Sequence, residues 1–373
     1  MSTSTRLVSV DLLRGGIMVL MAIDHASFLV AGVHATEFWG YPLPAYDDAG
    51  WFLTRFVTHF CAPGFFLLMG IGMAHSERPA RWFALRGGLL VLLQLLVEDP
   101  AWLIGSLGSG ADAGVGAVTD GRVAGGGSEI RVHLGVLYAL GMSMLMWGVL
   151  RRLPSLAIAA LSVAAIVVSA LYVPGNLDPD TLYGPLARLL LVPGHSNWLQ
   201  VYYPLLPWVG VTGLGLILGR ELRRRPARTM ALLPWLGLGL LVLFALMRAA
   251  GAGDAHAPTE GWIGWLNLTK YPPGPAFLSL TVGGVLLGLA LAARVPASAL
   301  GAGNPLLVFG GSALFFYLLH LYVYAAMGLV LPRGGLAMVY GSWLAGLAVL
   351  YPACRWYGSF KRGKAADSVW RLF

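Results

Sequence analysis

The sequence predicts an all-α fold, namely a polytopic helical membrane protein with about ten transmembrane helices. Hydrophobic residues make up 57% of its 373 residues, charged residues make up only 11%, and the mean hydropathy is +0.72. In an average soluble protein about a quarter of the residues are charged. So few charges could not cover the surface of a soluble globule. The composition therefore excludes a soluble enzyme, a disordered chain and a coiled coil.

Apolar stretches of the length that crosses a bilayer recur along the chain. A hydrocarbon core of about 30 Å needs about 20 apolar residues in a helix. Such stretches predict transmembrane helices at 10–33, 52–75, 81–97, 131–150, 155–174, 200–219, 229–250, 274–293, 305–331 and 335–354. These unbroken runs differ from the ten-residue alternating strands of a β-barrel, which is excluded. We expect the helices to form a single transmembrane domain over residues 1–373.

The first stretch is expected to stay in the protein as a helix. Arg14, Asp24 and His25 interrupt its apolar run, which a cleaved signal peptide would keep unbroken. The stretches 200–219 and 274–293 are rich in glycine, and small residues let helix backbones approach closely in lipid. We therefore expect these two helices to pack tightly against neighbours.

Basic residues predict the orientation of the helices. With the N-terminus in the cytoplasm, the loops and tails on that side carry 18 of the 25 Lys and Arg residues, in agreement with the positive-inside rule. Both termini are therefore predicted to be cytoplasmic. The long loops 34–51, 98–130, 175–199 and 251–273 then lie outside. Because the cations sit at helix ends, the net charge of +8 indicates topology and not nucleic-acid binding.

Ionisable residues inside a membrane span are costly and mark functional sites. The first predicted helix has four of them: Asp11, Arg14, Asp24 and His25. At 100° per residue, Arg14 and His25 are about 20° apart and share one face. Asp11 and Arg14 are three residues apart and can pair. This pair is either a salt bridge that fixes the depth of the helix or a contact for an anion near the cytoplasmic face.

Polar residues on five segments are expected at a similar depth, in the outer half of the membrane. A single histidine in a span usually bonds between helices, whereas three at compatible depths, with carboxylates and a lysine nearby, favour an active group. Glu98 is expected to end the third helix on the outer side. The residues expected to meet in one outward-facing cavity are His25, His59, Glu98, Asn267, Lys270, Tyr271, Tyr317 and His320.

Zinc is an alternative partner for a group of His, Asp and Glu. No HxxxH or HExxH spacing supports a zinc site in this sequence. Cys61 and Cys354 lie in or at the end of apolar stretches, without the spacing of metal ligands or of a disulfide framework. We therefore expect no metal.

Four segments resemble one family of membrane enzymes. They are RLVSVDLLRG at 6–15 followed by MAIDH at 21–25, FVTHFCAP at 56–63, LNLTKYPP at 266–273 and LFFYLLHLY at 314–322. In order and spacing they resemble the heparan-α-glucosaminide N-acetyltransferase-like family of transmembrane acyltransferases, in particular its bacterial inner-membrane members. The resemblance covers nearly the whole chain and says little about the substrate.

The resemblance implies an enzyme of the cell's inner membrane that passes acetyl groups from cytosolic acetyl-CoA to a sugar or glycan outside. In lysosomal members the acceptor is the amine of a terminal glucosamine, and a histidine at the outer end of the first helix is catalytic. His25 matches the Asp-His pair of bacterial members, whereas His34 matches the histidine of lysosomal members by position. Ala26-Ser27-Phe28 departs from the Arg-Asp-aromatic run that is common after His25.

The residue types suit this chemistry. Imidazole, with an ordinary pKa of about 6.5, can take a proton from an amine or hydroxyl at neutral pH, and Asp24 or Glu37 could orient the ring. The catalytic candidates are His25, His34, Asp24, His59 and His320. The candidates for binding the CoA diphosphate are Arg14, Arg78, Arg81 and Arg86. Those for binding the acceptor or the oxyanion are Asn267, Lys270, Tyr271, Tyr317 and Glu98.

Two other functions remain open, as do several details of the enzyme. A transporter for an anionic solute or an acylated sugar would also gather ionisable residues at the midplane, although the sequence shows no clear repeat. A catalytically inactive scaffold is the third reading. Whether histidine acts as a base or accepts the acetyl group itself is open. The choice between amine and hydroxyl acceptors and the formation of a homodimer are open as well.

Overall fold

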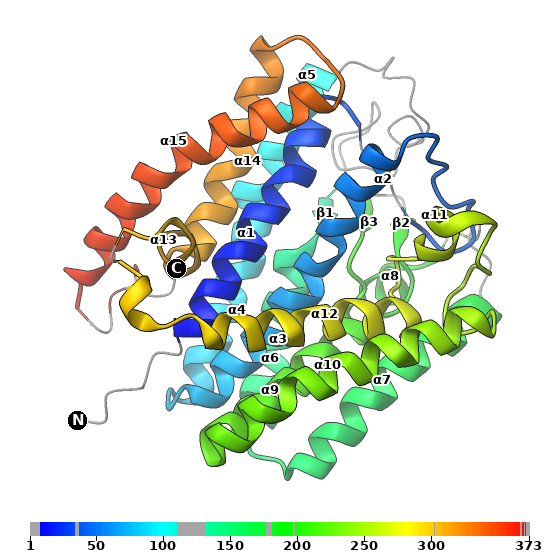
Figure 1. Ribbon diagram of the computed structural model, residues 1–373, viewed down its shortest axis with the longest axis vertical. Helices are drawn as coiled ribbons and strands as arrows, with labels where there is room; N and C mark the ends of the chain where they lie inside the picture. The colour runs from blue at the N-terminus through cyan, green and yellow to red at the C-terminus, as the bar shows by residue number, and fades with distance from the viewer. Residues whose placement is uncertain are drawn as a thin grey trace.

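The computed structural model of the protein describes residues 8–33, 37–109, 132–176, 181, 183–196, 198–301, 303–365, 368 and 370. Figure 1 shows its long helices gathered into one bundle. Within the described part of the chain, nine helical segments are long and apolar enough to cross a membrane. The polytopic helical membrane fold is therefore confirmed.

The elements follow one another in an order close to the predicted one. The apolar helices are α1 (Val8–Leu29), α2 (Ala49–Phe56) continued by the 3-10 turn η1 (Val57–Phe60) and α3 (Cys61–His75), α4 (Ala80–Leu93) continued by η2 (Gln94–Glu98) and α5 (Asp99–Ser109), α6 (Val136–Leu150), α7 (Ser155–Asn176), α9 (Leu205–Arg224), α10 (Pro226–Ala249), α12 (Pro275–Arg294), α13 (Pro305–Gly311), α14 (Ala313–Val330) and α15 (Leu336–Arg362). The short elements are α8 (Pro185–Leu190), α11 (Gly261–Leu266), η3 (Ala297–Ala299), β1 (Val132–Leu134), β2 (Gly194–Ser196) and β3 (Leu199–Val201).

The fourth predicted span, 131–150, begins later than expected. Its first described residues form strand β1, which runs parallel to β3, and β3 pairs antiparallel with β2. Helix α6 starts only at Val136 and has 15 residues. It therefore rises about 22 Å, less than the about 30 Å of a hydrocarbon core. The strand satisfies the backbone hydrogen bonds of the segment that the helix leaves out.

The third predicted span, 81–97, is longer than expected. The helix continues past Glu98 through the π-helical turn η2 into α5. This wider turn ends two residues before Pro100, whose nitrogen cannot donate a hydrogen bond to an earlier turn. The prediction that Glu98 ends the helix on the outer surface is wrong, because Glu98 lies inside the span and its residue is only 2% exposed.

The ninth predicted span, 305–331, is two helices, α13 and α14, which meet at Ser312. Helix α1 touches α13 through backbone atoms. A Cβ at Gly15 would lie 1.8 Å from the carbonyl oxygen of Leu306, and a Cβ at Gly310 would lie 2.0 Å from that of Asp11. Glycine is required at both positions for this approach, which fixes the inner half of α1 on α13.

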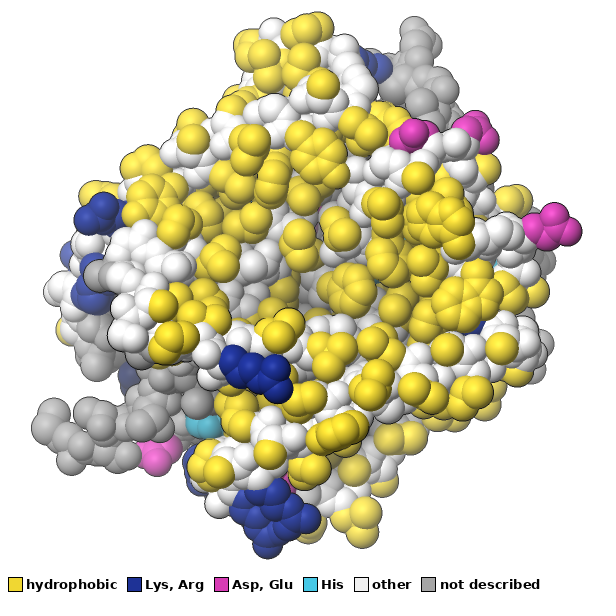
Figure 2. All heavy atoms as spheres, in the orientation of Figure 1, with side chains coloured by type: hydrophobic (Ala, Val, Ile, Leu, Met, Phe, Trp, Pro, Cys, Tyr) yellow, Lys and Arg dark blue, Asp and Glu magenta, His cyan; other side chains and the backbone are white. Residues whose placement is uncertain are grey.

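The loops that carry the predicted cytoplasmic cations contact one another. Arg151 donates to the carbonyls of Ser76, at 2.8 Å, and of Arg78, while Arg220 donates to the carbonyl of Leu153 at 2.9 Å. In Figure 2 most of the visible Lys and Arg side chains lie toward the edge where Figure 1 places both termini, and most of the visible Asp and Glu side chains lie toward the opposite edge. Hydrophobic side chains cover the face between them.

Candidate active site

A cavity of about 90 Å³ lies where α1, η1, α3, η2, α5 and the start of α6 meet the outer segments. Its wall is polar on several sides and aromatic on others. The ionisable and hydroxyl side chains that line it include Asp24, His25, Glu98, His133, Lys270 and Tyr317, and the aromatic ones include Trp102, Tyr202, Tyr203 and Tyr271. We call this space the outer cavity.

His25 on α1 and His320 on α14 are in direct contact. Nδ1 of His25 lies 2.5 Å from Nε2 of His320. Nδ1 of His320 lies 3.1 Å from the carbonyl oxygen of Phe316, one turn earlier in the same helix. The indole of Trp102 packs edge-on against the His25 ring. His25 lines the outer cavity, whereas His320 stands behind it and is completely buried.

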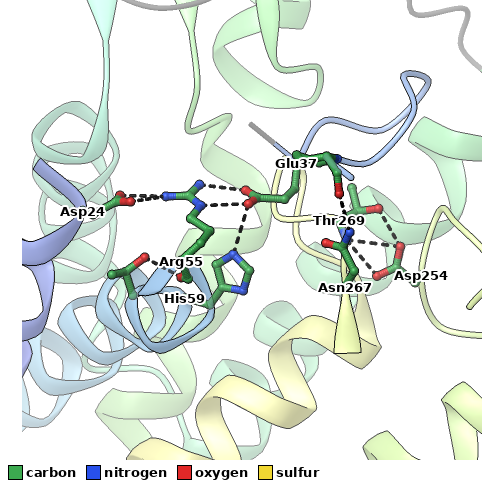
Figure 3. A network of polar contacts seen from close by, with 9 residues as sticks. Asp24, Glu37, Arg55, His59, Asp254, Asn267 and Thr269 are labelled. Carbon is green, nitrogen blue, oxygen red and sulfur yellow. Dashed lines mark hydrogen bonds and ion pairs between the residues drawn. The ribbon is translucent and has the colours of Figure 1, made fainter. Parts of the chain in front are cut away.

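A second polar group joins α1, α2 and the outer segment that follows α1 (Figure 3). The guanidinium of Arg55 donates from Nη1 to both carboxylate oxygens of Asp24, at 2.6 and 2.7 Å. From Nε and Nη2 it donates to the two oxygens of Glu37, at 2.8 and 2.7 Å. Nε2 of His59 lies 3.3 Å from Glu37 Oε1. Arg55 therefore binds the buried carboxylate of Glu37 and the partly buried carboxylate of Asp24 at once.

The electrostatics of Glu37 follow from this group. Burial alone would raise the pKa of its carboxyl, but the charge and hydrogen bonds of Arg55, together with His59, hold that pKa well below its usual range. Glu37 is thus an ionised carboxylate in the folded protein. It lies outside the membrane-spanning helices, in the segment between α1 and α2.

The backbone of Glu37 fixes the segment that precedes α12. Its carbonyl oxygen accepts hydrogen bonds from the backbone nitrogens of Lys270 and Tyr271, both at 3.0 Å. Nearby, Asp254 accepts from the backbone nitrogen and the hydroxyl of Thr269, as Figure 3 shows. Lys270 and Tyr271 are thereby placed at the wall of the outer cavity.

Glu98 faces the outer cavity from the π-helical turn. Its Oε1 accepts hydrogen bonds from the hydroxyl of Tyr317, at 2.8 Å, and from Nε1 of Trp102, at 3.3 Å. Its Oε2 is buried and has no hydrogen-bond partner among the described residues. On the same wall, burial first and then Tyr271 raise the pKa of the Tyr203 phenol well above its usual range, so that Tyr203 is a neutral hydroxyl. The cavity therefore offers both acceptors and donors of hydrogen bonds.

Two larger cavities open on the side of the chain termini. One of about 370 Å³, the inner cavity, has apolar walls that include Met18, Met69 and Leu140, with Arg14, Arg86 and Lys361 among them. The other, the vestibule, measures about 700 Å³ and is lined by Arg14, Arg355, Lys361 and Arg362. The two share Arg14, Gly311 and Lys361. The inner cavity in turn shares Phe65, Val136 and Tyr317 with the outer cavity.

Of the predicted site residues, six line the outer cavity: Asp24, His25, Glu98, Lys270, Tyr271 and Tyr317. His320 contacts His25 from behind, and His59 contacts Glu37 outside the cavity wall. Asn267 donates to the carbonyl of Pro44 at 2.9 Å and does not line the cavity. His34 lies outside the described residues.

The predicted phosphate-binding arginines divide into two pairs. Arg14 and Arg86 line the inner cavity, and Arg14 also donates to Asp11 at 2.9 Å and to the carbonyl of Gly310 at 3.2 Å. The salt bridge that the sequence allowed between Asp11 and Arg14 is therefore present. Arg78 and Arg81 line neither the inner cavity nor the vestibule.

Sequence reasoning missed several residues of these cavities. Three of them are cations near the end of α15: Arg355, Lys361 and Arg362. In the sequence they look like the basic residues that commonly end a span on the cytoplasmic side. His133 follows a long outer loop, and no pattern in the sequence joins it to Glu98. Tyr202 and Tyr203 stand directly before α9, and a polar-aromatic pair at the start of a span was the only available signal.

Comparison with known proteins points to one family. The family model described as heparan-alpha-glucosaminide N-acetyltransferase, catalytic, matches residues 6–248. The match includes α1 to α9, with His25, Arg55 and Glu98, and most of α10. The helices α12 to α15, with His320 and Lys361, lie beyond it. A search of the curated proteins finds no match.

Proposed function

Because the chain belongs to the heparan-α-glucosaminide N-acetyltransferase catalytic family, we propose that it moves an acetyl group from cytosolic acetyl-CoA to an amine or hydroxyl of an extracytoplasmic sugar. We place it in the inner membrane of the cell, with both termini in the cytoplasm. The observation that carries the proposal is the position of His25. It lines an outer cavity that shares wall residues with a cation-lined cavity on the side of the termini.

The inner cavity and the vestibule suit the two halves of the donor. Arginine and lysine bind phosphate through charge-assisted hydrogen bonds, and arginine can donate two of them in parallel. Arg14 and Lys361 line both spaces, and Arg355 and Arg362 add cations to the vestibule. The CoA phosphates would bind there. The pantetheine arm would then lie along the apolar wall of the inner cavity and bring the thioester toward Tyr317 and His25.

The chemistry centres on Nε2 of His25. In a direct transfer, this nitrogen takes the proton from the acceptor amine or hydroxyl while the acceptor's nitrogen or oxygen bonds to the thioester carbon. The carbon–sulfur bond then breaks, the acetyl group stays on the acceptor, and the CoA thiolate takes the proton from the imidazolium. The oxyanion that forms in between would accept a hydrogen bond from Lys270, because the single hydroxyl proton of Tyr317 is donated to Glu98.

A two-step transfer uses the same nitrogen as a nucleophile. Nε2 attacks the thioester carbon and CoA leaves as the thiolate. The acceptor then displaces the histidine from the acetyl group, and the freed Nε2 takes the acceptor's proton. Asn267, which hydrogen-bonds to Pro44, is not needed for either route. His59 is assigned to the Glu37 group and not to proton transfer.

The test uses purified protein in sealed vesicles, with acetyl-CoA on the side of the termini and glucosamine on the other. Acceptor-dependent release of CoA, with acetylated sugar on the far side, would support direct transfer. Release without acceptor, with label left on the protein, would support the two-step route. A His25→Gln variant serves as the inactive control.

A transporter is the alternative that the same experiment addresses. Cavities on both sides of a membrane protein also fit alternating access. If no CoA is released with any amine or hydroxyl acceptor while labelled solute accumulates in the vesicles, the acetyltransferase proposal is wrong.

A further inference from the structure

The contact between His25 and His320 fixes the direction of a hydrogen-bond chain. A carbonyl oxygen only accepts, so the 3.1 Å contact between His320 Nδ1 and the Phe316 carbonyl requires a proton on Nδ1. A neutral imidazole carries one N–H, and Nε2 of His320 is then an acceptor. His25 Nδ1, 2.5 Å away, must be the donor.

The neutral form of His320 follows from its surroundings. The residue is 0% exposed, and the rings packed on it belong to Phe316, Tyr317 and Tyr324 as well as His25. No carboxylate among the described residues hydrogen-bonds to it. A buried imidazolium without a paired anion would be strongly unfavourable. The chain therefore runs from His25 Nδ1–H through His320 Nε2, and from His320 Nδ1–H to the backbone.

We infer that His320 is a positioning residue that holds His25 in its Nδ1–H tautomer and so leaves Nε2 of His25 unprotonated at the outer cavity. The expected effect on kcat rests on the proposed function. The tautomer of His25 can be measured whether or not the protein transfers acetyl groups. His320 lies on α14, beyond the segment that the family model matches.

The tautomer decides whether His25 can act. In the Nε2–H tautomer the cavity-side nitrogen carries a proton and can neither accept one nor attack a thioester. In a Ser-His-Asp protease the wrong tautomer lowers kcat by about 10⁴. The hydrogen-bond chain from His25 ends at the backbone carbonyl of Phe316, which is neutral. It therefore stabilises the tautomer less than a carboxylate would. We expect a loss of kcat of about 10²-fold when His320 is replaced by an apolar residue.

The first measurement is spectroscopic and needs no substrate. Solid-state NMR on histidine-¹⁵N-labelled protein in bilayers distinguishes a protonated from an unprotonated ring nitrogen, and a His25→Gln variant identifies the His25 signals. We expect Nδ1–H with unprotonated Nε2 in the unaltered protein, and a mixture of tautomers in His320→Leu. Nε2–H as the main form in the unaltered protein would overturn the inference, whatever the activity.

The second measurement compares His320→Leu with His320→Gln. The amide oxygen of glutamine reaches about as far as Nε2 of histidine and can accept from His25 Nδ1–H. We expect kcat to fall about 10²-fold in the leucine variant and to recover at least 10-fold in the glutamine variant, with KM for acetyl-CoA unchanged in both. Equal kcat values for the two variants would contradict the inference.

A matched control tests general loss of packing on α14. Tyr324→Phe removes the 3.1 Å hydrogen bond to the Trp343 carbonyl but keeps the ring. We expect its kcat to stay within about twofold of the unaltered protein. If the unaltered protein transfers no acetyl group, the proposed function fails, and the NMR measurement alone still decides the tautomer.

Discussion

Arg55 and Glu37 form two parallel hydrogen bonds, from Nε to Oε1 at 2.8 Å and from Nη2 to Oε2 at 2.7 Å, and their side chains are only 6% and 0% exposed. This fork ties the outer segment after α1 to helix α2. Because the Glu37 backbone also accepts from Lys270 and Tyr271, the same fork positions two residues of the cavity wall.

Removing Arg55 is expected to destabilise the protein strongly. Arg55→Leu would leave Glu37 as a buried carboxylate without the Arg55 cation, and breaking a buried ion pair in this way costs about 3–5 kcal/mol. The control is Glu221→Gln, which breaks the exposed pair with Arg224 at 3.7 Å and should cost less than about 1 kcal/mol. Thermal unfolding in detergent measures both. Equal melting temperatures for the two variants would refute the structural role of the fork.

The pH dependence of stability provides a second prediction. The pKa of Glu37 in the folded protein is well below its ordinary value of 4.5, so the unfolded state binds the proton more readily. The stabilisation by Glu37 is therefore fully present above about pH 5 and is lost as the pH falls through the folded pKa. We expect Glu37→Gln to lower the melting temperature by the same amount at pH 6 and pH 8, and by less near about pH 3. An effect that grows toward acid would reverse the sign and disprove the assignment.

The contact of α1 with α13 predicts opposite effects at neighbouring glycines. At Gly15 a methyl group would lie 1.8 Å from the carbonyl oxygen of Leu306, whereas at Gly16 it would meet no heavy atom of the described residues within 4 Å. Gly15→Ala should therefore cost about 1–3 kcal/mol of stability by forcing the helices apart. Gly16→Ala should be neutral or slightly stabilising, since alanine favours helix over glycine. Thermal unfolding of the two variants measures the difference in stability, and a separate measurement of acetyl-CoA binding shows whether the cavities are kept.

Cations of the vestibule are expected to select for the nucleotide half of the donor. Arg14→Ala and Lys361→Ala should each raise KM for acetyl-CoA about 10-fold, because one charge-assisted contact to phosphate is lost. For acetyl-pantetheine, which lacks the nucleotide, KM should change little. Arg228→Ala, an exposed cation on α10 outside these cavities, is the control. If Arg14→Ala raises KM equally for acetyl-CoA and acetyl-pantetheine, Arg14 does not bind the nucleotide, and its role is the salt bridge with Asp11.

The predicted orientation can be measured directly in cells. Cys61 and Cys354 are both buried, so an added cysteine dominates labelling. Glu260 lies between α10 and α11, in a loop predicted to be outside, and Arg225 lies between α9 and α10; both positions are exposed and each is replaced by cysteine. A membrane-impermeant maleimide should label the first in intact cells and the second only after lysis. The reverse pattern would invert the topology and assign the vestibule to the outside.

The sequence predicted most of the fold, because long apolar runs admit few structures in lipid. It failed where the chain is irregular inside the membrane. The π-helical turn before Pro100 keeps its local backbone hydrogen bond, from Asp99 to the Gln94 carbonyl, and carries the helix past Glu98. Strand β1 replaces the first turn of α6 because it pairs with β3, which is distant in sequence.

The sequence predicted which site residues lie at a similar depth in the membrane, but not which of their side chains touch. The expected depth brought His25, Lys270 and Tyr317 to one cavity, as the structure shows. Depth could not reveal that His59 bonds to Glu37, or that the amide of Asn267 turns to Pro44, because those partners depend on how the outer segments fold back.

Phe65, Val136 and Tyr317 each line both the outer and the inner cavity. These three side chains, two of which are apolar, form the wall that the two spaces have in common. Under the proposed function, an acetyl group transferred at this wall would need no continuous column of water through the bilayer. The proposed reaction takes one substrate from each side, and transfer at this wall would let it proceed without a path for protons across the membrane.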